Sequence, residues 1–351
     1  MKEAVKTPFL EESVDNFRNE ISDCLFKKYG LFPLDHITYL LKEELEFIDD
    51  KGKKKEVIIL YDFIKWLKKE EIPYWLRGAA GSSLLFYILG ITRGNPLPAH
   101  SLCPKCKSMN WLDHDYYSGY DVKGILKCEE DGESLLTDGH NIPWQSLWGY
   151  SGEEVNYEVD MPKKFYEKIK TYWQIYQEEV LEENILEIRE DLEKIRFSNI
   201  DCISVIEGFN PNFYKNEIDI DEAVEYFDLE DIPKPSNFSD LLYALGLYHS
   251  TGVWTLNVKF MLQNLDMNLS DMVAFREDIY FYLLEHGYSK FDAWLGLDAF
   301  RRPDPYFEIT EEMKLASDKW KLAIFKDILY LFPKAHFLEY LIFSIKNKEK
   351  Y

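Results

Sequence analysis

Three cysteines in the first half of the chain have the spacing of metal ligands. Cys103 and Cys106 form a Cys-x-x-Cys pair, and Cys128 follows after 21 intervening residues. Such spacing is typical of structural zinc sites built from two short loops that supply two ligands each. Asp131 stands where the second loop would place its second cysteine, so the spacing favours it as the fourth ligand. We expect structural zinc (Zn²⁺), because four protein ligands leave no open position for chemistry.

Two alternatives remain open for this site. His114 or His140 could supply the fourth ligand in place of Asp131. The three cysteines could also be reduced thiols in a loop that has lost its metal, because three thiolates are one ligand short of the full set.

A second group of residues could bind phosphate. Residues 77–83 read RGAAGSS and run directly into an apolar helical stretch. Backbone N–H groups and serine hydroxyls at the start of a helix can hold phosphate oxygens at its positive end. The candidates are Arg77, Gly81, Ser82 and Ser83. Small residues before a helix more often serve close packing, so the turn alone does not decide between these interpretations.

Helices are expected to position both groups. Residues 14–70 carry apolar side chains at steps of three and four, which predicts helices. Residues 96–156 lose this period and gather Gly, Pro, Cys, Asp and His, as in a loop-rich insert. A charged helical stretch follows from residue 163, and prolines mark a boundary near residues 233–237. We therefore divide the chain into four parts: 1–95, 96–156, 157–235 and 236–351.

Composition and charge restrict the partners of this chain. It has 351 residues, and 46% of them are hydrophobic, which is typical of a folded protein. The 63 acidic and 41 basic residues give a formal charge of −22, so contact with DNA needs a local basic patch or a metal ion. The five cysteines, the absence of a signal peptide and the lack of a long apolar run predict a cytoplasmic protein with no membrane partner.

The order of several motifs resembles one protein family. After RGAAGSS come GITRGNPLPAH, CPKC with KCEED, TDGHNIPW, and YEVD at 157–160. Further along stand FSDLLYALGLYHSTGVW, MVAFREDIYFYL and YLFPKAHFLEYLIFSI. Together these segments resemble the alpha subunit of bacterial DNA polymerase III of the PolC type.

The resemblance implies an α+β fold that is predominantly helical. It consists of a reduced nucleotidyltransferase palm like that of polymerase beta, with a zinc-knuckle insert at 96–156 and an all-helical fingers-like domain at 236–351. In such a polymerase the Gly-Ser turn grips the incoming triphosphate, and the zinc module braces the palm beside it. The resemblance also implies dNTP, DNA and replication proteins as partners.

The family's functional residues carry over to matching positions. Glu158 and Asp160 match its Asp-x-Asp pair, and Asp201 is the candidate for a third aspartate. Such carboxylates hold two magnesium ions (Mg²⁺) that activate the primer hydroxyl and neutralise the leaving pyrophosphate. The resemblance also implies three nucleotide-binding residues in the fingers-like part: Arg276, Lys334 and His336.

Several departures put polymerase activity in doubt. Glu158 carries one methylene more than the aspartate of the family, and Ala79 stands where the family has a serine. By this resemblance the segment between Asp160 and Asn199 is much shorter than in the family, and we expect no counterpart of the family's exonuclease and duplex-binding tail. We therefore expect a truncated paralogue with weak or no polymerase activity that acts by binding a nucleotide, DNA or a replication component. The alternative is a minimal magnesium-dependent DNA nucleotidyltransferase.

Overall fold

A computed structural model describes most of the chain. The described residues are 8–113, 116–152, 155, 157–161, 163–180, 195–198, 233, 235–254, 256–264, 267–301, 325 and 327–347. They form a mixed α/β structure that is rich in helices and contains two small sheets, so the coarse expectation of a mixed, helix-rich fold is confirmed.

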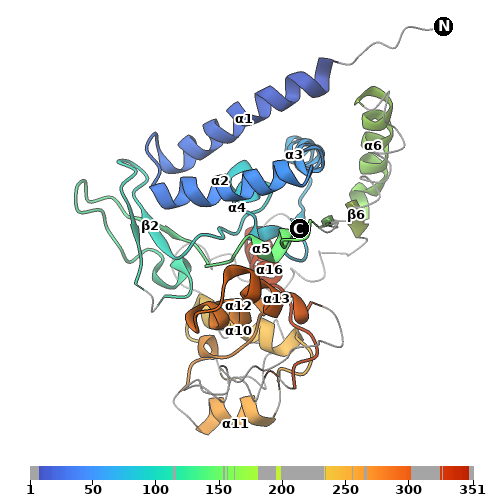
Figure 1. The fold of residues 1–351 in the computed structure, drawn as a ribbon. Helices are drawn as coiled ribbons and strands as arrows, with labels where there is room; N and C mark the ends of the chain where they lie inside the picture. The colour runs from blue at the N-terminus through green and yellow to red at the C-terminus, as the bar shows by residue number, and fades with distance from the viewer. Residues whose placement is uncertain are drawn as a thin grey trace, which may run out of the picture.

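Four helices build the N-terminal part: α1 (Pro8–Tyr29), α2 (Asp35–Asp50), α3 (Lys54–Lys69) and α4 (Leu84–Leu89). In α2 the buried positions Ile37, Leu41, Glu44 and Ile48 recur at steps of three and four, so one face of the helix points inward. The helix α1 lies above α2, with α3 seen end-on near one end of α2 and α4 below it (Figure 1). Apolar side chains from α1, α2, α3 and α4 share one hydrophobic core.

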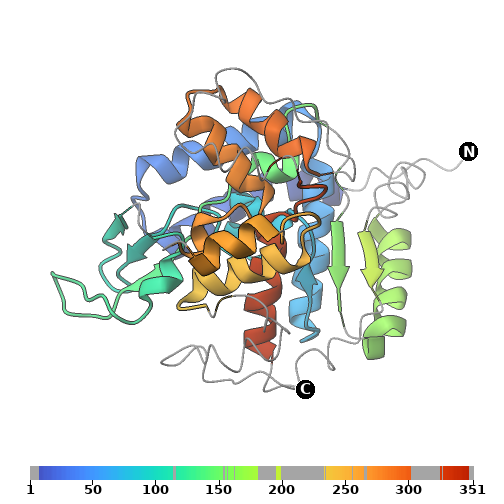
Figure 2. The same ribbon diagram turned by 90° about the horizontal axis from the view of Figure 1, so that it is seen from below.

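The first sheet joins distant segments in the order β1-β5-β6. The strands are β1 (Trp75–Leu76), β5 (Tyr157–Asp160) and β6 (Ile195–Ser198). Strand β1 runs antiparallel to β5, which runs parallel to β6. Helix α6 (Tyr166–Val180) connects toward β6 and lies beside it at one edge of the molecule (Figure 2). The pairing places the residues just after β1 next to the YEVD strand.

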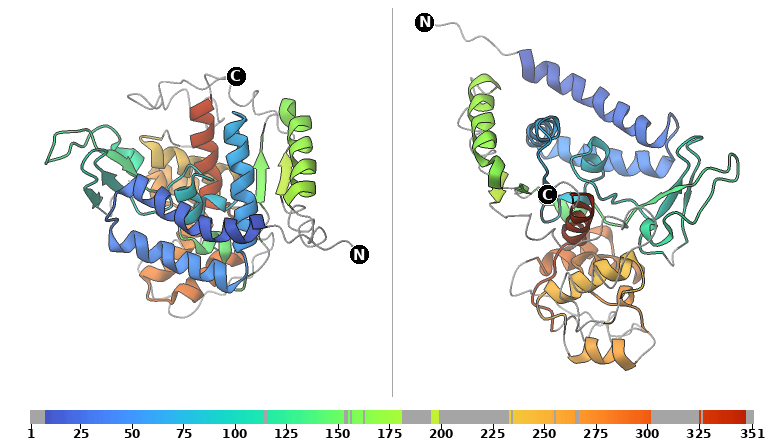
Figure 3. Two further views of the ribbon diagram at one scale, coloured as in Figure 1. Left: turned by 90° about the horizontal axis from the view of Figure 1, so that it is seen from above. Right: turned by 180° about the vertical axis from the view of Figure 1, so that it is seen from behind.

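The second sheet belongs to the insert and has the order β3-β2-β4. Its strands are β2 (His100–Leu102), β3 (Met109–Trp111) and β4 (Leu136–Asp138), all antiparallel to their neighbours. A short turn of 3-10 helix, η2 (Gly119–Val122), lies between β3 and β4 in the chain. The insert projects from one side of the molecule as a wing (Figures 1 and 3).

A group of helices forms the C-terminal part. They are α10 (Phe238–His249), α11 (Leu256–Asn264), α12 (Arg276–Glu285), α13 (Lys290–Ala299) and α16 (Lys334–Asn347). Their apolar side chains share a second hydrophobic core. The short helix α5 (Gln145–Trp148) of the preceding part lies above α12 and α13.

Helix α16 connects the two parts of the molecule. It lies where the N-terminal and C-terminal helices meet (Figures 1 and 3). Leu338, Leu341 and Ile342 belong to the second core, whereas Phe343 packs against Trp75 of β1. Among the described residues, no helix combines the length and the apolar character needed to cross a membrane.

Candidate functional site

The four predicted zinc ligands converge in the insert. The ligand atoms of Cys103, Cys106, Cys128 and Asp131 all lie within 4.8 Å of one another. Cys106 Sγ is 3.7 Å from Cys128 Sγ, and Cys103 Sγ is 3.4 Å from Asp131 Oδ2. A tetrahedral zinc ion with ordinary bond lengths would separate two sulfurs by about 3.8 Å, and a sulfur and an oxygen by about 3.5 Å. The donor set and its spacing therefore fit a zinc ion.

The two loops that carry these ligands have the same hydrogen-bond pattern. In each loop the backbone C=O of the first ligand accepts a hydrogen bond from the N–H four residues later in the chain. The backbone N–H of the same residue donates to the C=O five residues later. The four bonds are Lys107 N to Cys103 O (3.1 Å), Cys103 N to Ser108 O (2.8 Å), Gly132 N to Cys128 O (2.9 Å) and Cys128 N to Glu133 O (2.8 Å). In each loop the residue after the second ligand has a positive φ, 63° at Lys107 and 74° at Gly132. Asp131 thus occupies the position equivalent to Cys106.

The alternative ligand His140 lies in a different environment. Its side chain is buried, with Nδ1 2.9 Å from Ser118 Oγ and Nε2 3.6 Å from Asp138 Oδ1. His114 lies outside the described residues. Of the two acidic or histidine candidates that the structure describes, only Asp131 lies beside the thiols.

The Gly-Ser turn and the YEVD strand face each other. Arg77 N donates to Glu158 O (2.9 Å) as the turn leaves β1. Arg77 Nε lies 3.8 Å from Glu158 Oε2 and 3.7 Å from Asp160 Oδ2, so both carboxylates approach one point. Asp160 is fully buried, whereas Glu158 is partly exposed. Asp201, the expected third carboxylate, lies outside the described residues.

Helix α16 covers the Gly-Ser turn. Gly78 N donates to His336 Nδ1 (3.0 Å), so this ring nitrogen is an acceptor. A methyl group placed on Gly81 would lie 3.3 Å from Ala335 Cβ and 3.1 Å from Glu339 Cγ. Burial, together with the charge of Arg77, lowers the pKa of His336 to about 3. The ring is therefore neutral at physiological pH.

The hydroxyls of the two serines contact the protein itself. Ser82 Oγ donates to Ala79 O (2.8 Å), and Ser83 Oγ donates to Glu44 Oε1 (2.5 Å). Ser83 also accepts from Phe86 N (3.0 Å), which makes it the N-cap of α4. Both serines are fully buried. In this arrangement the serines close the turn and start the helix.

Arg276 and Lys334 hold the C-terminal helices against the preceding part. Arg276 Nη2 donates to Ser146 O (2.6 Å), and the Ser146 hydroxyl donates to the fully buried carboxylate of Glu277. Lys334 N donates to Glu277 Oε2 (2.9 Å), and Lys334 Nζ donates to His140 O (2.8 Å). Burial lowers the pKa of Lys334. Both cations therefore have protein partners in this structure.

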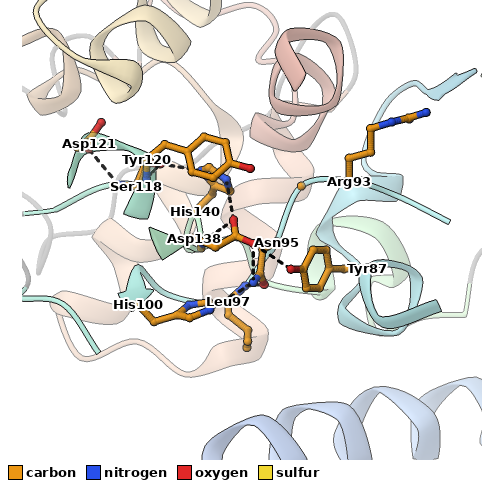
Figure 4. Close-up of polar contacts among 12 residues, drawn as sticks. Tyr87, Arg93, Asn95, Leu97, His100, Ser118, Tyr120, Asp121, Asp138 and His140 are labelled. Atoms are coloured by element: carbon orange, nitrogen blue, oxygen red, sulfur yellow. Dashed lines mark hydrogen bonds and ion pairs between the residues drawn. The ribbon is translucent and has the colours of Figure 1, made fainter. Parts of the chain in front are cut away.

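A buried polar network surrounds Asp138 (Figure 4). Its Oδ2 accepts from Tyr87 Oη (2.9 Å) and Asn95 Nδ2 (3.2 Å), and its Oδ1 accepts from Gly139 N (2.8 Å). Burial alone would raise the pKa of Asp138, but the nearby His140 ring, with Nε2 3.6 Å from Oδ1, holds it well below its ordinary value. The network therefore joins the NPLPAH segment, α4 and β4 through Asn95, Tyr87 and Asp138.

The same network extends to the C-terminal helices. Ser118 N donates to Asp121 Oδ2 (3.2 Å), and Asp121 accepts from both the N–H (2.9 Å) and the hydroxyl (2.6 Å) of Ser239 in α10. Tyr120 packs its ring edge against His140, with centroids 4.8 Å apart (Figure 4). The insert is thus fixed to the C-terminal helices by buried polar contacts.

A large cavity lies between the insert and the C-terminal helices. It has a volume of about 1130 Å³. Its lining includes several aromatic side chains and several acids, with Lys334 on one wall. The acids that line it are Asp113, Asp271, Glu277, Asp278 and Glu285. This lining is unfavourable for a phosphate group, because like charges repel in a partly desolvated site.

Two carboxylates near the turn were not singled out from the sequence. Glu44 is fully buried and accepts from Ser83 Oγ, Leu85 N (3.0 Å) and Trp148 Nε1 (2.8 Å). Glu339 is also fully buried and lies against Gly81. Glu44 occupies an inward position of the α2 period, which is the signal that could have identified it.

Comparisons with known proteins find relatives that share one description. The family model described as bacterial DNA polymerase III alpha NTPase domain matches residues 15–195, which is more than half of the chain. A DNA polymerase III PolC-type from Listeria welshimeri is 22% identical over 99% of this chain, and one from Thermotoga petrophila is 23% identical over 99%. One from Thermotoga maritima is 31% identical over 44% of this chain.

These relatives are much longer proteins. The two that match nearly all of this chain do so with 32% and 34% of their own length, so the chain spans about a third of each. The Thermotoga maritima protein matches with 11% of its length. The matched segment includes the Gly-Ser turn, the cysteine cluster and the YEVD strand. The chain therefore belongs to the bacterial DNA polymerase III alpha family, as a diverged PolC-like member.

Proposed function

We propose that this chain is a reduced PolC-like protein that incorporates nucleotides weakly or not at all. It acts by binding a nucleotide, primer-template DNA or a component of the replication machinery. In this proposal residues 1–95 and 157–235 form palm-like parts around the insert at 96–156, and residues 236–351 form a fingers-like part.

The closure of the Gly-Ser turn by α16 is the observation that carries this proposal. A turn that grips a triphosphate must present its N–H and hydroxyl donors to the ligand. Here Gly78 N donates to His336, and the serine hydroxyls donate to Ala79 and Glu44. Each of these donors would have to exchange a protein partner for a phosphate oxygen, which reduces the gain from binding.

The cations expected to bind the triphosphate support the same conclusion. Arg276 is committed to Ser146, and Lys334 is committed to the carbonyl of His140. Both are almost fully buried. His336 accepts a hydrogen bond through Nδ1 and is neutral, so it adds no positive charge at this position.

A second candidate function rests on Glu158 and Asp160. Both carboxylates lie within 3.8 Å of Arg77 Nε, so they approach a common point as paired metal ligands must. Carboxylate oxygens are the ligands that Mg²⁺ prefers, so Glu158 and Asp160 would hold it. When bound, magnesium would supply positive charge to stabilise the transferred phosphoryl group. In this structure the guanidinium of Arg77 supplies part of the positive charge beside these two carboxylates. This arrangement favours a minimal nucleotidyltransferase that also uses Asp201.

We further propose that the insert holds a structural zinc ion through Cys103, Cys106, Cys128 and Asp131. The four ligand atoms are within 4.8 Å of one another and include three sulfurs, which suits zinc. Four protein ligands close the coordination shell. The ion would therefore stabilise the wing and take no part in phosphoryl transfer.

A primer-extension assay tests the proposed function. Labelled dNTP and a primer-template are incubated with the purified chain and magnesium or manganese, with Asp160→Ala as the matched control. We expect incorporation by the unaltered chain to be weak or to equal the background of Asp160→Ala. Efficient, processive incorporation that requires Asp160 would refute the leading proposal and support the nucleotidyltransferase. Binding of dNTP and of primer-template DNA is then measured by titration calorimetry and fluorescence anisotropy to identify the ligand class.

A further inference from the structure

The carboxylate of Glu339 lies in a small cluster of donors beside the Gly-Ser turn. Its Oε1 accepts from Arg93 N (2.7 Å) and Gly94 N (2.6 Å), two successive backbone N–H groups. Arg93 Nη1 lies 3.9 Å from the other oxygen, Oε2. The carboxylate is fully buried, and its two short bonds have the lengths of charge-assisted hydrogen bonds.

We propose that Arg93 and Gly94 form an oxyanion-binding site and that Glu339 occupies it as an internal latch. Successive backbone N–H groups that converge on one point make concave sites for anions, and the guanidinium of Arg93 adds positive charge. The chain's own carboxylate fills this site and holds α16 in place.

The residues around Glu339 pack closely against α16. A methyl group on Gly94 would lie 2.5 Å from Leu338 Cδ2 and 2.8 Å from Leu338 Cγ, so a side chain at position 94 would require Leu338 of α16 to move. A methyl group on Gly81 would lie 3.1 Å from Cγ of the same Glu339 side chain. Glu339 thus fills the space between the oxyanion site and the Gly-Ser turn.

The latch rests on the proposed function and extends it, because it gives a physical cause for the closure of the Gly-Ser turn by α16. Holding Glu339 at Arg93 and Gly94 keeps Ala335 and His336, one turn earlier in α16, against Gly81 and Gly78. A ligand for this site must carry an oxyanion, either a carboxylate or a phosphate. Such a ligand competes with Glu339 and loosens α16 over the turn.

The variant Glu339→Ala tests the oxyanion site. This variant removes the carboxylate that accepts from the N–H groups of Arg93 and Gly94 and lies beside the Arg93 guanidinium. In a buffer with chloride as the anion, we therefore expect its melting temperature to lie about 5–10 °C below that of the unaltered chain. Acetate and inorganic phosphate, each compared with chloride at matched ionic strength, should restore at least half of this loss. Acetate is the carboxylate probe and phosphate the phosphate probe, so the two arms distinguish the preferred source.

Two controls separate anion binding from general salt effects. The unaltered chain and Glu46→Ala, which removes an exposed carboxylate 3.6 Å from Lys42 Nζ, should gain no more than they do from any stabilising salt. If acetate and phosphate raise their melting temperatures as much as that of Glu339→Ala, the oxyanion site is refuted. Glu339→Gln keeps an oxygen acceptor in place, so it should lose less stability and show no rescue. Equal loss and equal rescue in Glu339→Gln would also refute the proposal.

Hydrogen exchange of the peptide that contains Gly78 tests the latch. We expect this peptide to exchange faster in Glu339→Ala than in the unaltered chain, because α16 no longer holds His336 against the turn, and acetate or phosphate should slow it again. Unchanged exchange would show that Glu339 is not a latch. Primer extension by the unaltered chain tests only the proposed function, and hydrogen exchange in Glu339→Ala tests only the latch. A failure of the proposed function and a failure of the latch are therefore distinguishable.

Discussion

His336 should make the stability of this protein depend on pH in a way that one substitution removes. Its ring is 9% exposed and packs against Trp75, with centroids 5.3 Å apart, while Nδ1 accepts from Gly78 N. Burial and the nearby charge of Arg77 lower the pKa of His336 to about 3. In the unfolded chain a histidine titrates near about 6.5.

The sign and size of the effect follow from these two pKa values. As pH falls below about 6.5 the unfolded chain takes up a proton at His336, whereas the folded chain does not until the pH approaches 3. Folding stability from this group is therefore complete above pH 6.5 and is lost progressively as pH falls toward 3. At pH 5 the loss relative to pH 7 is about 2 kcal/mol.

The variant His336→Asn isolates this contribution. The Asn side chain places Oδ1 near the position of Nδ1 and can accept from Gly78 N, but it does not titrate. Urea unfolding followed by tryptophan fluorescence at pH 7 and at pH 5 measures the free energy of unfolding of both proteins. We expect the unaltered chain to lose about 2 kcal/mol more than His336→Asn over this interval. Equal losses in the two proteins would refute the reasoning, since all other groups titrate in both.

Three further substitutions test the insert and the buried network. Cys103→Ser should lower the zinc content, measured by elemental analysis, from about one ion per chain to near zero; an unaltered chain without zinc contradicts the site. Asp131→Cys completes a four-thiolate set that zinc prefers, so zinc release to a coloured chelator should slow by about tenfold; equal or faster release contradicts the role of Asp131. Tyr87→Phe removes the hydroxyl that donates to Asp138 and should cost about 1.5–3 kcal/mol in urea unfolding; an unchanged midpoint contradicts the network.

The convergence of the cysteine cluster was predictable because its spacing is local. A Cys-x-x-Cys loop fixes two ligand atoms by its own backbone hydrogen bonds, and the Cys128 to Asp131 loop repeats those bonds. The segment that connects the two loops in the sequence only has to be long enough for the loops to come together. The sequence therefore indicated that four ligand atoms would gather, and the structure places them within 4.8 Å of one another.

The surroundings of the Gly-Ser turn could not be predicted in the same way. Glu44 and Glu339 are distant from the turn in the sequence, and a single acidic residue in a helix is usually exposed to solvent. Ser83 caps the N-terminus of α4, but the acceptor of its hydroxyl is 39 residues away in the sequence. Long-range polar contacts of this kind depend on how the helices pack. The order of the motifs identified the family. It did not show that hydrogen-bond donors of the Gly-Ser turn would be paired with acceptors from the chain's own helices.

The position of α16 has a consequence for how the chain is made. The described segments that α16 contacts, including β1, the turn and the loop at Arg93 and Gly94, precede it in the sequence and leave the ribosome before it does. Until the helix emerges, the apolar face of Trp75 and the donors of the turn are open to water and to other proteins. Synthesis therefore passes through a stage in which this transiently exposed surface is prone to association with other chains, and that stage ends when α16 docks.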